Sequence, residues 1–87
     1  MFAELISALD HDQKSELFRR HITPQLITEW KKGRRLPTEV QVVDVAAVTG
    51  TEWADLQREI TVLRAPADRR EQIAHAIRWK GPTSSKV

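Results

Sequence analysis

Apolar side chains recur every three or four residues along most of the chain, which is the spacing of one face of an α-helix. The sequence has no sustained alternation of apolar and polar residues between hairpin turns, so the pattern predicts an all-α fold of five or six helices. Three segments carry clear buried stripes: Phe2, Leu5, Ile6 and Leu9; Val42, Val45, Ala46 and Thr49; and Trp53, Leu56, Ile60 and Leu63.

A polar segment predicts the start of the second helix. Asp10-His11-Asp12 interrupts the first apolar stripe and is expected to form a connector and an N-cap. The helix that follows should cover about residues 13–20. Its apolar face is thin and consists of Leu17 and Phe18, so its stability should depend on packing against neighbouring helices.

The third helix has a defined start and a defined end. Thr23-Pro24 predicts its first turn, because the threonine hydroxyl can cap the helix and proline at the first position loses no hydrogen bond. The helix is expected over residues 24–32, and Gly33 supplies a left-handed stop. We expect Ile27 and Trp30 to face the core, leaving a polar outer face.

Proline and glycine bound the fourth and fifth helices. The fourth is expected to begin near Pro37 and to end at Gly50, which accepts a left-handed backbone. The fifth is expected to be capped by Thr51 and to end before Pro66, because proline cannot continue the hydrogen-bond ladder. Residues 1–65 would then form the main domain.

A sixth helix is expected near the C-terminus. Asp68 and Glu71 stand three residues apart, which favours a capping box at its start. We expect residues 66–81 to serve as a dimerisation element and residues 82–87 to form a flexible tail. The helix would end at Gly81 and carry Ile73, Ala76, Ile77 and Trp79.

The composition is that of one small domain without cysteine chemistry. Its 87 residues leave no room for a second independent core, and 40% hydrophobic residues is typical of a folded chain. The lack of cysteine excludes disulfides, thiolate zinc sites and cysteine nucleophiles, and a domain this small gains from pairing with a second copy. Without a recognisable targeting segment or an apolar run of about 20 residues, we expect a cytoplasmic protein with no membrane contact.

Charge is distributed in blocks along the chain. The 14 basic and 12 acidic residues give a net charge of only +2. Residues 19–37, however, carry six basic residues against Glu29, a net charge of +5, and residues 61–87 carry six against two, a net charge of +4. Acidic residues dominate the segments 1–18 and 38–60. A local basic patch of this kind is suited to binding phosphate.

The first basic block coincides with a predicted helix, tight turn and helix. Two helices joined by about three residues at 21–23 form the unit whose second helix can enter the DNA major groove, about 12 Å wide. Its exposed side chains would meet base edges, with glutamine suited to adenine, glutamate to cytosine, and threonine or proline carbons to the thymine methyl. The expected base-reading residues are Pro24, Gln25, Thr28 and Glu29.

The residues around this helix are suited to the phosphate backbone. Free N–H groups at helix N-termini attract phosphate, and basic side chains set affinity without setting sequence. The alternative interpretation is that a short basic amphipathic helix forms an ordinary solvated face. The expected phosphate-binding residues are Gln13, Lys14, Arg19, Arg20, Thr23, Lys31, Lys32, Arg34 and Arg35.

Gln13 opens the second predicted helix, Ile22 and Ile27 are apolar positions of the turn and the third helix, and residues 30–37 have the pattern W-x-x-G-x-x-x-P. In these features the segment resembles the Cro/CI-type helix-turn-helix family of phage and bacterial repressors. The likeness covers about residues 5–63. The chain also resembles small phage-related repressors, including those of filamentous prophages. The resemblance implies a λ-repressor-like DNA-binding domain in the nucleoid of a bacterial or phage-infected cell.

Two positions depart from the family pattern. The family usually has a small residue where this chain has Leu17, and glycine where it has His21. Leu17 would wedge the two helices apart unless neighbouring elements compensate. His21 must adopt a left-handed backbone, which is uncommon for histidine.

Other classes of site have weaker support in the sequence. His11, His21 and His75 share no i, i+4 spacing, so we expect neither a metal site nor a cofactor. No nucleophile motif or phosphate-binding loop is present, and the protein is not expected to be an enzyme. Trp30 and Trp53 fall on apolar stripes and are expected in the core.

The function indicated is a sequence-specific DNA-binding transcriptional regulator, of the phage-repressor type, acting on a palindromic operator as a homodimer. The alternative is an antitoxin or anti-repressor whose C-terminal helix binds a partner protein. Trp79 is compatible with packing on its own domain or with a dimer interface. The expected dimer residues are Leu63, Ile73, Ile77 and Trp79, with Val62 beside them.

Overall fold

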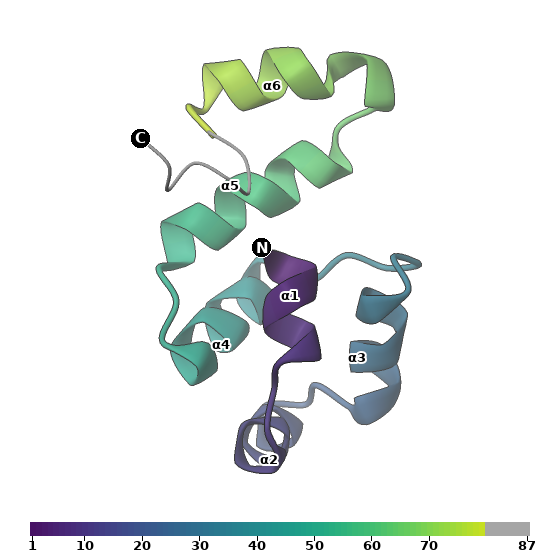
Figure 1. The fold of residues 1–87 in the computed structure, drawn as a ribbon, viewed down its shortest axis with the longest axis vertical. Helices are drawn as coiled ribbons and strands as arrows, with labels where there is room; N and C mark the ends of the chain where they lie inside the picture. Colours follow the sequence, from purple (N-terminus) through teal and green to yellow (C-terminus); the bar gives the residue numbers. More distant parts are fainter. Residues whose placement is uncertain (80–87) are drawn as a thin grey trace.

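Six α-helices and one short 3-10 helix make up the protein in a computed structural model that describes residues 1–79 (Figure 1). No strand occurs within these residues, which confirms the all-α prediction. The elements are α1 (Phe2–Ser7), α2 (His11–Arg19), α3 (Pro24–Lys31), α4 (Glu39–Thr49), α5 (Trp53–Arg64), the 3-10 helix (Ala67–Arg69) and α6 (Arg70–Ala76).

The core lies between α1, α3, α4 and α5, and α2 closes one end of it. The apolar stripes predicted for residues 2–9, 42–49 and 53–63 face inward, apart from Trp53. Phe2 of α1 meets Trp30 of α3 edge to face, with ring centroids 5.5 Å apart, a favoured aromatic arrangement. The members of the hydrophobic core cluster on these helices are Phe2, Ile6, Leu17, Ile27, Trp30, Val42, Val45, Ala46, Leu56 and Ile60.

Capping boxes start two helices at positions that differ slightly from the predicted ones. Asp10 accepts from the Gln13 N–H, and the Gln13 side chain accepts from the Asp10 N–H, so α2 begins two residues earlier than predicted. Thr38 and Gln41 form the same reciprocal pair, so α4 begins at Glu39, two residues after the Pro37 near which its start was predicted. In both cases the three-residue spacing of the cap sets the first turn.

The start of α5 corrects two predictions. Thr51 does not cap the helix, because its hydroxyl is bonded to that of Thr49 at 2.8 Å and Glu52 occupies the N-cap position without a side-chain bond. Trp53, expected in the core, is 41% exposed. It is the first residue of α5, at the end of the stripe formed by Leu56 and Ile60, and so it extends past the core.

The C-terminal part also differs from the prediction. Asp68 and Glu71 do not form a capping box, because Asp68 belongs to the 3-10 helix and α6 starts without a side-chain cap. The helix ends at Ala76, before Trp79, and Arg78 then adopts a left-handed φ of 61°. The predicted stop at Gly81 and the predicted tail at residues 82–87 lie outside the described residues.

One buried carboxylate connects α5 to α1. Glu59 is 8% exposed, and it accepts a hydrogen bond of 2.8 Å from the backbone N–H of Phe2. The amino group of Met1 lies 3.2 Å from the same carboxylate. Glu59 thus supplies a partner for an N–H of the first turn of α1, which has no partner within its own helix.

None of the helices within residues 1–79 is both long enough and apolar enough to cross a membrane. The longest of them, α5, has 12 residues, whereas about 20 are needed to span a bilayer. Charged residues also interrupt it, including Asp55 and Arg58.

Candidate nucleic-acid interface

The turn between α2 and α3 has a left-handed residue at its centre. His21 has a φ of 69°, so this histidine does adopt the conformation usually provided by glycine. Its N–H donates to the carbonyl of Phe18 at 3.0 Å, and the N–H of Ile22 donates to the carbonyl of Leu17 at 2.9 Å. These two bonds close the end of α2 and direct the chain into α3.

Leu17 is accommodated because the two helices pack mainly on other elements. α2 packs on α4, and α3 packs on α1 (Figure 1). Leu17 and Ile22 are almost fully buried, with 0% and 1% of their surface exposed. The large side chain at position 17 therefore contributes to the common core. Its packing against neighbouring helices compensates for the wedging of α2 and α3 that was expected from a large residue at this position.

The ends of α3 match the prediction closely. The Thr23 hydroxyl accepts a hydrogen bond from the N–H of Leu26 at 3.2 Å, and Pro24 occupies the first position of the helix. Gly33 has a φ of 73° and follows the C-cap, and the N–H of Arg34 returns to the carbonyl of Glu29 at 3.0 Å. The helix is thus held at both ends by local bonds.

The outer face of α3 presents the residues predicted to contact bases. Pro24, Gln25 and Thr28 are exposed, and Glu29 is half-buried. The Thr28 hydroxyl donates to the carbonyl of Pro24 at 3.1 Å, so its methyl group and its oxygen lone pairs remain available to a ligand.

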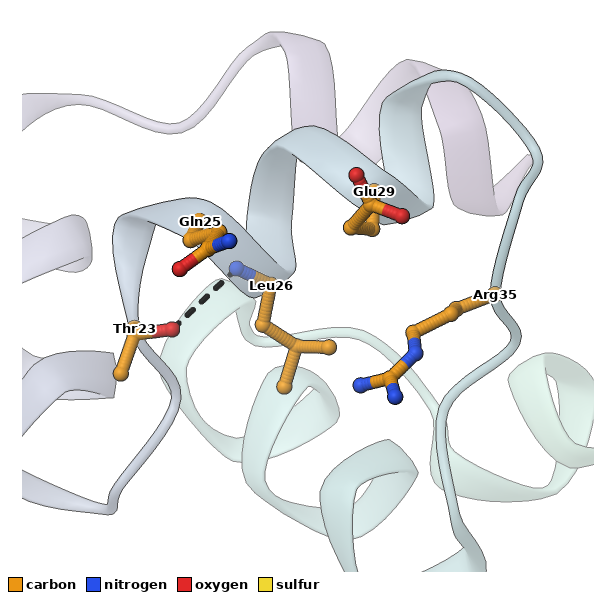
Figure 2. Close-up of a pocket in the computed structure, with 5 residues that line it drawn as sticks. All are labelled: Thr23, Gln25, Leu26, Glu29 and Arg35. Carbon is orange, nitrogen blue, oxygen red and sulfur yellow. Dashed lines mark hydrogen bonds between the residues drawn. The ribbon is translucent and has the colours of Figure 1, made fainter.

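A groove of about 420 Å³ runs beside this face, lined by Thr23, Gln25, Leu26, Glu29 and Arg35 (Figure 2). Figure 2 shows the guanidinium of Arg35 extending from the segment after α3 back toward the helix. Arg64 of α5 donates a hydrogen bond to the carbonyl of Pro37, which fastens that segment to the domain. The groove brings an amide, a carboxylate and a guanidinium together, and such groups can hydrogen-bond to base edges and phosphates.

A smaller groove of about 120 Å³ lies where α2 meets α3. It is lined by Lys14 from α2 and by Pro24, Ile27, Thr28 and Lys31 from α3. Lys14 and Lys31 were predicted to bind phosphate, and they line this groove together with Thr28, which was predicted to read bases. The structure therefore gathers both predicted types of contact on one surface.

Several predicted phosphate ligands form ion pairs with carboxylates. Arg19 lies 2.6 Å from Glu16, and Arg34 lies 3.4 Å from Glu29. Within residues 1–79, four other cations of this region have no carboxylate oxygen within 4.0 Å of their charged nitrogens. These four are Lys14, Lys31, Lys32 and Arg35.

Arg20 connects α2 to α4. Its guanidinium lies 3.0 Å from Asp44 and 3.5 Å from Glu16. The hydrogen bond to Asp44 raises the pKa of Arg20 further above its ordinary value, despite an opposing contribution from desolvation. Arg20 therefore has a structural partner that the pattern of charges along the chain did not reveal.

Two of the predicted backbone ligands also cap helices. Gln13 uses its side-chain oxygen in the capping box of α2, which leaves the amide N–H₂ group as a donor. Thr23 uses its hydroxyl oxygen to cap α3, which leaves the hydroxyl proton free to donate. Both residues combine a structural bond with a spare donor at a helix N-terminus.

The predicted dimer residues lie on a different part of the molecule. α6 packs on α5 at the opposite end from α2 (Figure 1). Leu63, Ile73, Ile77 and Trp79 are each half-buried within the chain. Val62 is 4% exposed and belongs to the interior.

Phe18 is the residue of this region that the sequence interpretation missed. It was assigned to the apolar face of α2, but it is 60% exposed. Local spacing did not distinguish Phe18 from the buried Leu17, because the residues three and four positions before each of them are polar. Which of these two adjacent residues faces the core depends on how α2 packs on α4.

No protein-family model matches the chain, and no curated protein or solved structure shows a significant match to it. The chemistry of the α2–α3 surface is therefore what indicates a function. That surface has exposed polar side chains along α3, two capped helix N-termini, and grooves lined by cations without a carboxylate partner among residues 1–79. Such a surface can bind a polyanion and hydrogen-bond to groups between its charges.

Proposed function

We propose that the protein is a sequence-specific regulator of transcription that binds double-stranded DNA through α3 in the major groove. One observation carries the proposal: exposed Pro24, Gln25 and Thr28 line two grooves together with Lys14, Lys31 and Arg35, cations that have no carboxylate partner among residues 1–79. Leaving such cations close together is unfavourable for the isolated protein and favourable in a complex with phosphate.

Base recognition would come from the first two turns of α3. The Gln25 amide can make paired hydrogen bonds to adenine, and the carbons of Pro24 and Thr28 can contact a thymine methyl. Glu29 can accept from the amino group of cytosine. Its ion pair with Arg34 is exposed enough to be rearranged, since Arg34 has a side-chain exposure of 61%.

Backbone binding would fall first to the unpaired cations. Lys14, Lys31, Lys32 and Arg35 can each meet a phosphate without giving up a carboxylate. Arg19 and Arg34 would have to exchange a glutamate for a phosphate. Arg20 forms ion pairs with both Asp44 and Glu16, so it is expected to contribute least to DNA affinity.

The proposed regulator is a repressor of the phage type that binds a palindromic operator as a homodimer. One domain of this size offers few base contacts, and pairing doubles them. The half-sites would lie about one helical turn apart, roughly 34–36 Å. The contact between copies would be formed by the exposed parts of Leu63 on α5, of Ile73 on α6, and of Ile77 and Trp79, which follow α6.

Selection from random duplexes, followed by gel-shift competition, tests the proposal. The wild-type protein should enrich a defined site and prefer it over unrelated DNA. Gln25→Ala should reduce that preference by about 1–3 kcal/mol, because one base contact is lost. Gln72→Ala, on α6, is the matched control and should retain the preference. If no sequence is enriched, or if Gln25→Ala discriminates like the wild type, the assigned recognition surface is wrong.

A further inference from the structure

Phe18 borders a groove on the outer side of α2. The groove has a volume of about 510 Å³ and is lined by His11, Lys14, Ser15, Phe18, Arg19 and Pro24. The ring is 60% exposed. A single exposed apolar side chain is ordinary in proteins, so the residues around the ring decide whether it has a role.

The residues around the ring connect it to the proposed DNA surface. Lys14 lies one turn earlier on the same face of α2, and Pro24 is the first residue of α3. Both also line the adjoining groove with Thr28 and Lys31. Phe18 therefore borders the surface that carries the proposed base and phosphate contacts.

The ligand must suit an aromatic ring beside a cation. Lys14 has no carboxylate partner among residues 1–79 and gives the groove an unneutralised cation, whereas Arg19 in the same lining is paired with Glu16. A nucleotide of a DNA strand has this complementary chemistry, because an apolar deoxyribose stands next to an anionic phosphate. In helix-turn-helix complexes the first helix crosses the backbone, so a residue of α2 meets sugar and phosphate and not base edges.

We propose that Phe18 and Lys14 together bind one nucleotide of the DNA backbone, with the ring packed on a deoxyribose and the ammonium group on its phosphate. This contact rests on the proposed DNA-binding function and adds a non-ionic component to it. It increases affinity for every duplex and leaves sequence preference unchanged.

The two side chains are predicted to differ in their dependence on salt. Phe18→Ala should weaken binding about three- to tenfold, the range expected for removing part of a phenylalanine from apolar contact. The slope of log K against log salt should stay the same, because no charge is lost. Lys14→Gln should weaken binding and reduce the slope by about 0.9, the value for one phosphate contact.

The experiment measures dissociation constants over a series of salt concentrations on two duplexes of equal length, one with the selected site and one unrelated. Val40→Ala on α4 is the matched control, since Val40 is 70% exposed and lies outside the groove. Phe18→Leu keeps an apolar side chain and should restore most of the affinity. Circular dichroism melting should give the same midpoint for Phe18→Ala and wild type, because the ring is largely exposed.

Equal losses on both duplexes with an unchanged slope support the contact. Full affinity of Phe18→Ala on both duplexes overturns it and directs attention to a protein ligand for this groove. A loss confined to the selected duplex also overturns it, because Phe18 would then read a thymine methyl. Failure of the wild-type protein to bind either duplex contradicts the proposed function itself, an outcome distinct from the other three.

Discussion

At the scale of single residues, the same side chain often serves both the fold and the candidate site. Gln13 and Thr23 take part in helix capping, and each keeps a spare side-chain donor that could serve the proposed phosphate contacts. Arg20 serves the fold alone, because its guanidinium already forms ion pairs with Asp44 and Glu16. The distinction between paired and unpaired cations therefore separates residues that a count of charges treats alike.

This distinction leads to opposite predictions for two arginines. Arg35→Gln should reduce the salt slope of DNA binding by about 0.9 with little change in stability, because Arg35 is exposed and has no ion pair among residues 1–79. Arg20→Gln should leave the slope nearly unchanged and lower the melting midpoint slightly, because the connection to Asp44 is lost. Fluorescence titrations at several salt concentrations, with thermal melting of both variants, test the pair. Equal salt slopes for the two variants would show that an ion pair within the protein does not determine which arginine binds a DNA phosphate.

Glu59 provides a second prediction at this scale. Glu59→Ala leaves the buried N–H of Phe2 without an acceptor and should lower the free energy of unfolding by about 1–3 kcal/mol. Glu59→Gln keeps an acceptor oxygen in the same place and should lower the free energy of unfolding by a smaller amount. Urea denaturation followed by circular dichroism measures both. Equal losses would mean that the negative charge, and not the hydrogen bond, holds α1 against α5.

At the scale of elements, the left-handed turn residues decide where helices stop. Gly50 ends α4 with a φ of 69°, and His21 has the same φ in the turn after α2. A Cβ atom at Gly50 would meet no atom within 4 Å, so only the backbone conformation opposes a side chain there. Because a left-handed backbone costs an L-residue about 1–2 kcal/mol, the histidine turn stores strain that the glycine turn avoids.

Substitutions at these two positions should change stability in opposite directions. Gly50→Ala should destabilise the protein by about 1 kcal/mol, whereas His21→Gly should stabilise it by up to a similar amount, less the entropy cost of glycine in the unfolded chain. Urea denaturation measures both changes. A loss of stability in His21→Gly would indicate that the imidazole makes a favourable interaction that offsets its backbone strain.

The elements also show what local sequence can and cannot predict. Thr23, Pro24, Gly33 and Gly50 act through bonds or dihedral angles within a few residues, and the sequence predicted their roles correctly. The prediction that Trp53 is buried was wrong, because whether the first residue of an apolar stripe reaches the core depends on how α4 and α5 pack together. For the candidate site, the outward face of α3 was predictable from helical spacing. The pairing of Arg20 with Asp44 was not, because 24 positions separate the two residues.

At the scale of the whole molecule, the two surfaces of interest lie at opposite ends. α2 and α3 carry the proposed DNA surface, and α6 covers α5 at the other end (Figure 1). A second copy bound at α5 and α6 would leave α3 of each copy exposed, as binding to two half-sites requires. Ile73, Ile77 and Trp79 are already half-buried within the chain, so only part of each side chain is available to a second copy. A dimer formed through these residues should be weak in solution and strengthened by DNA.

Ile77→Asp tests this arrangement, since a carboxylate at the rim of α6 would oppose close contact between two copies. We expect sedimentation to show less self-association, and gel shifts to show weaker binding to a duplex with two half-sites. Binding to a single half-site should be unchanged, because α3 is not altered. Ala76→Asp places the same charge at an exposed neighbour and serves as the matched control, with circular dichroism to verify that both variants fold. If wild-type protein binds one and two half-sites with the same affinity per site, copies do not cooperate, and the α6 surface is available to a different protein.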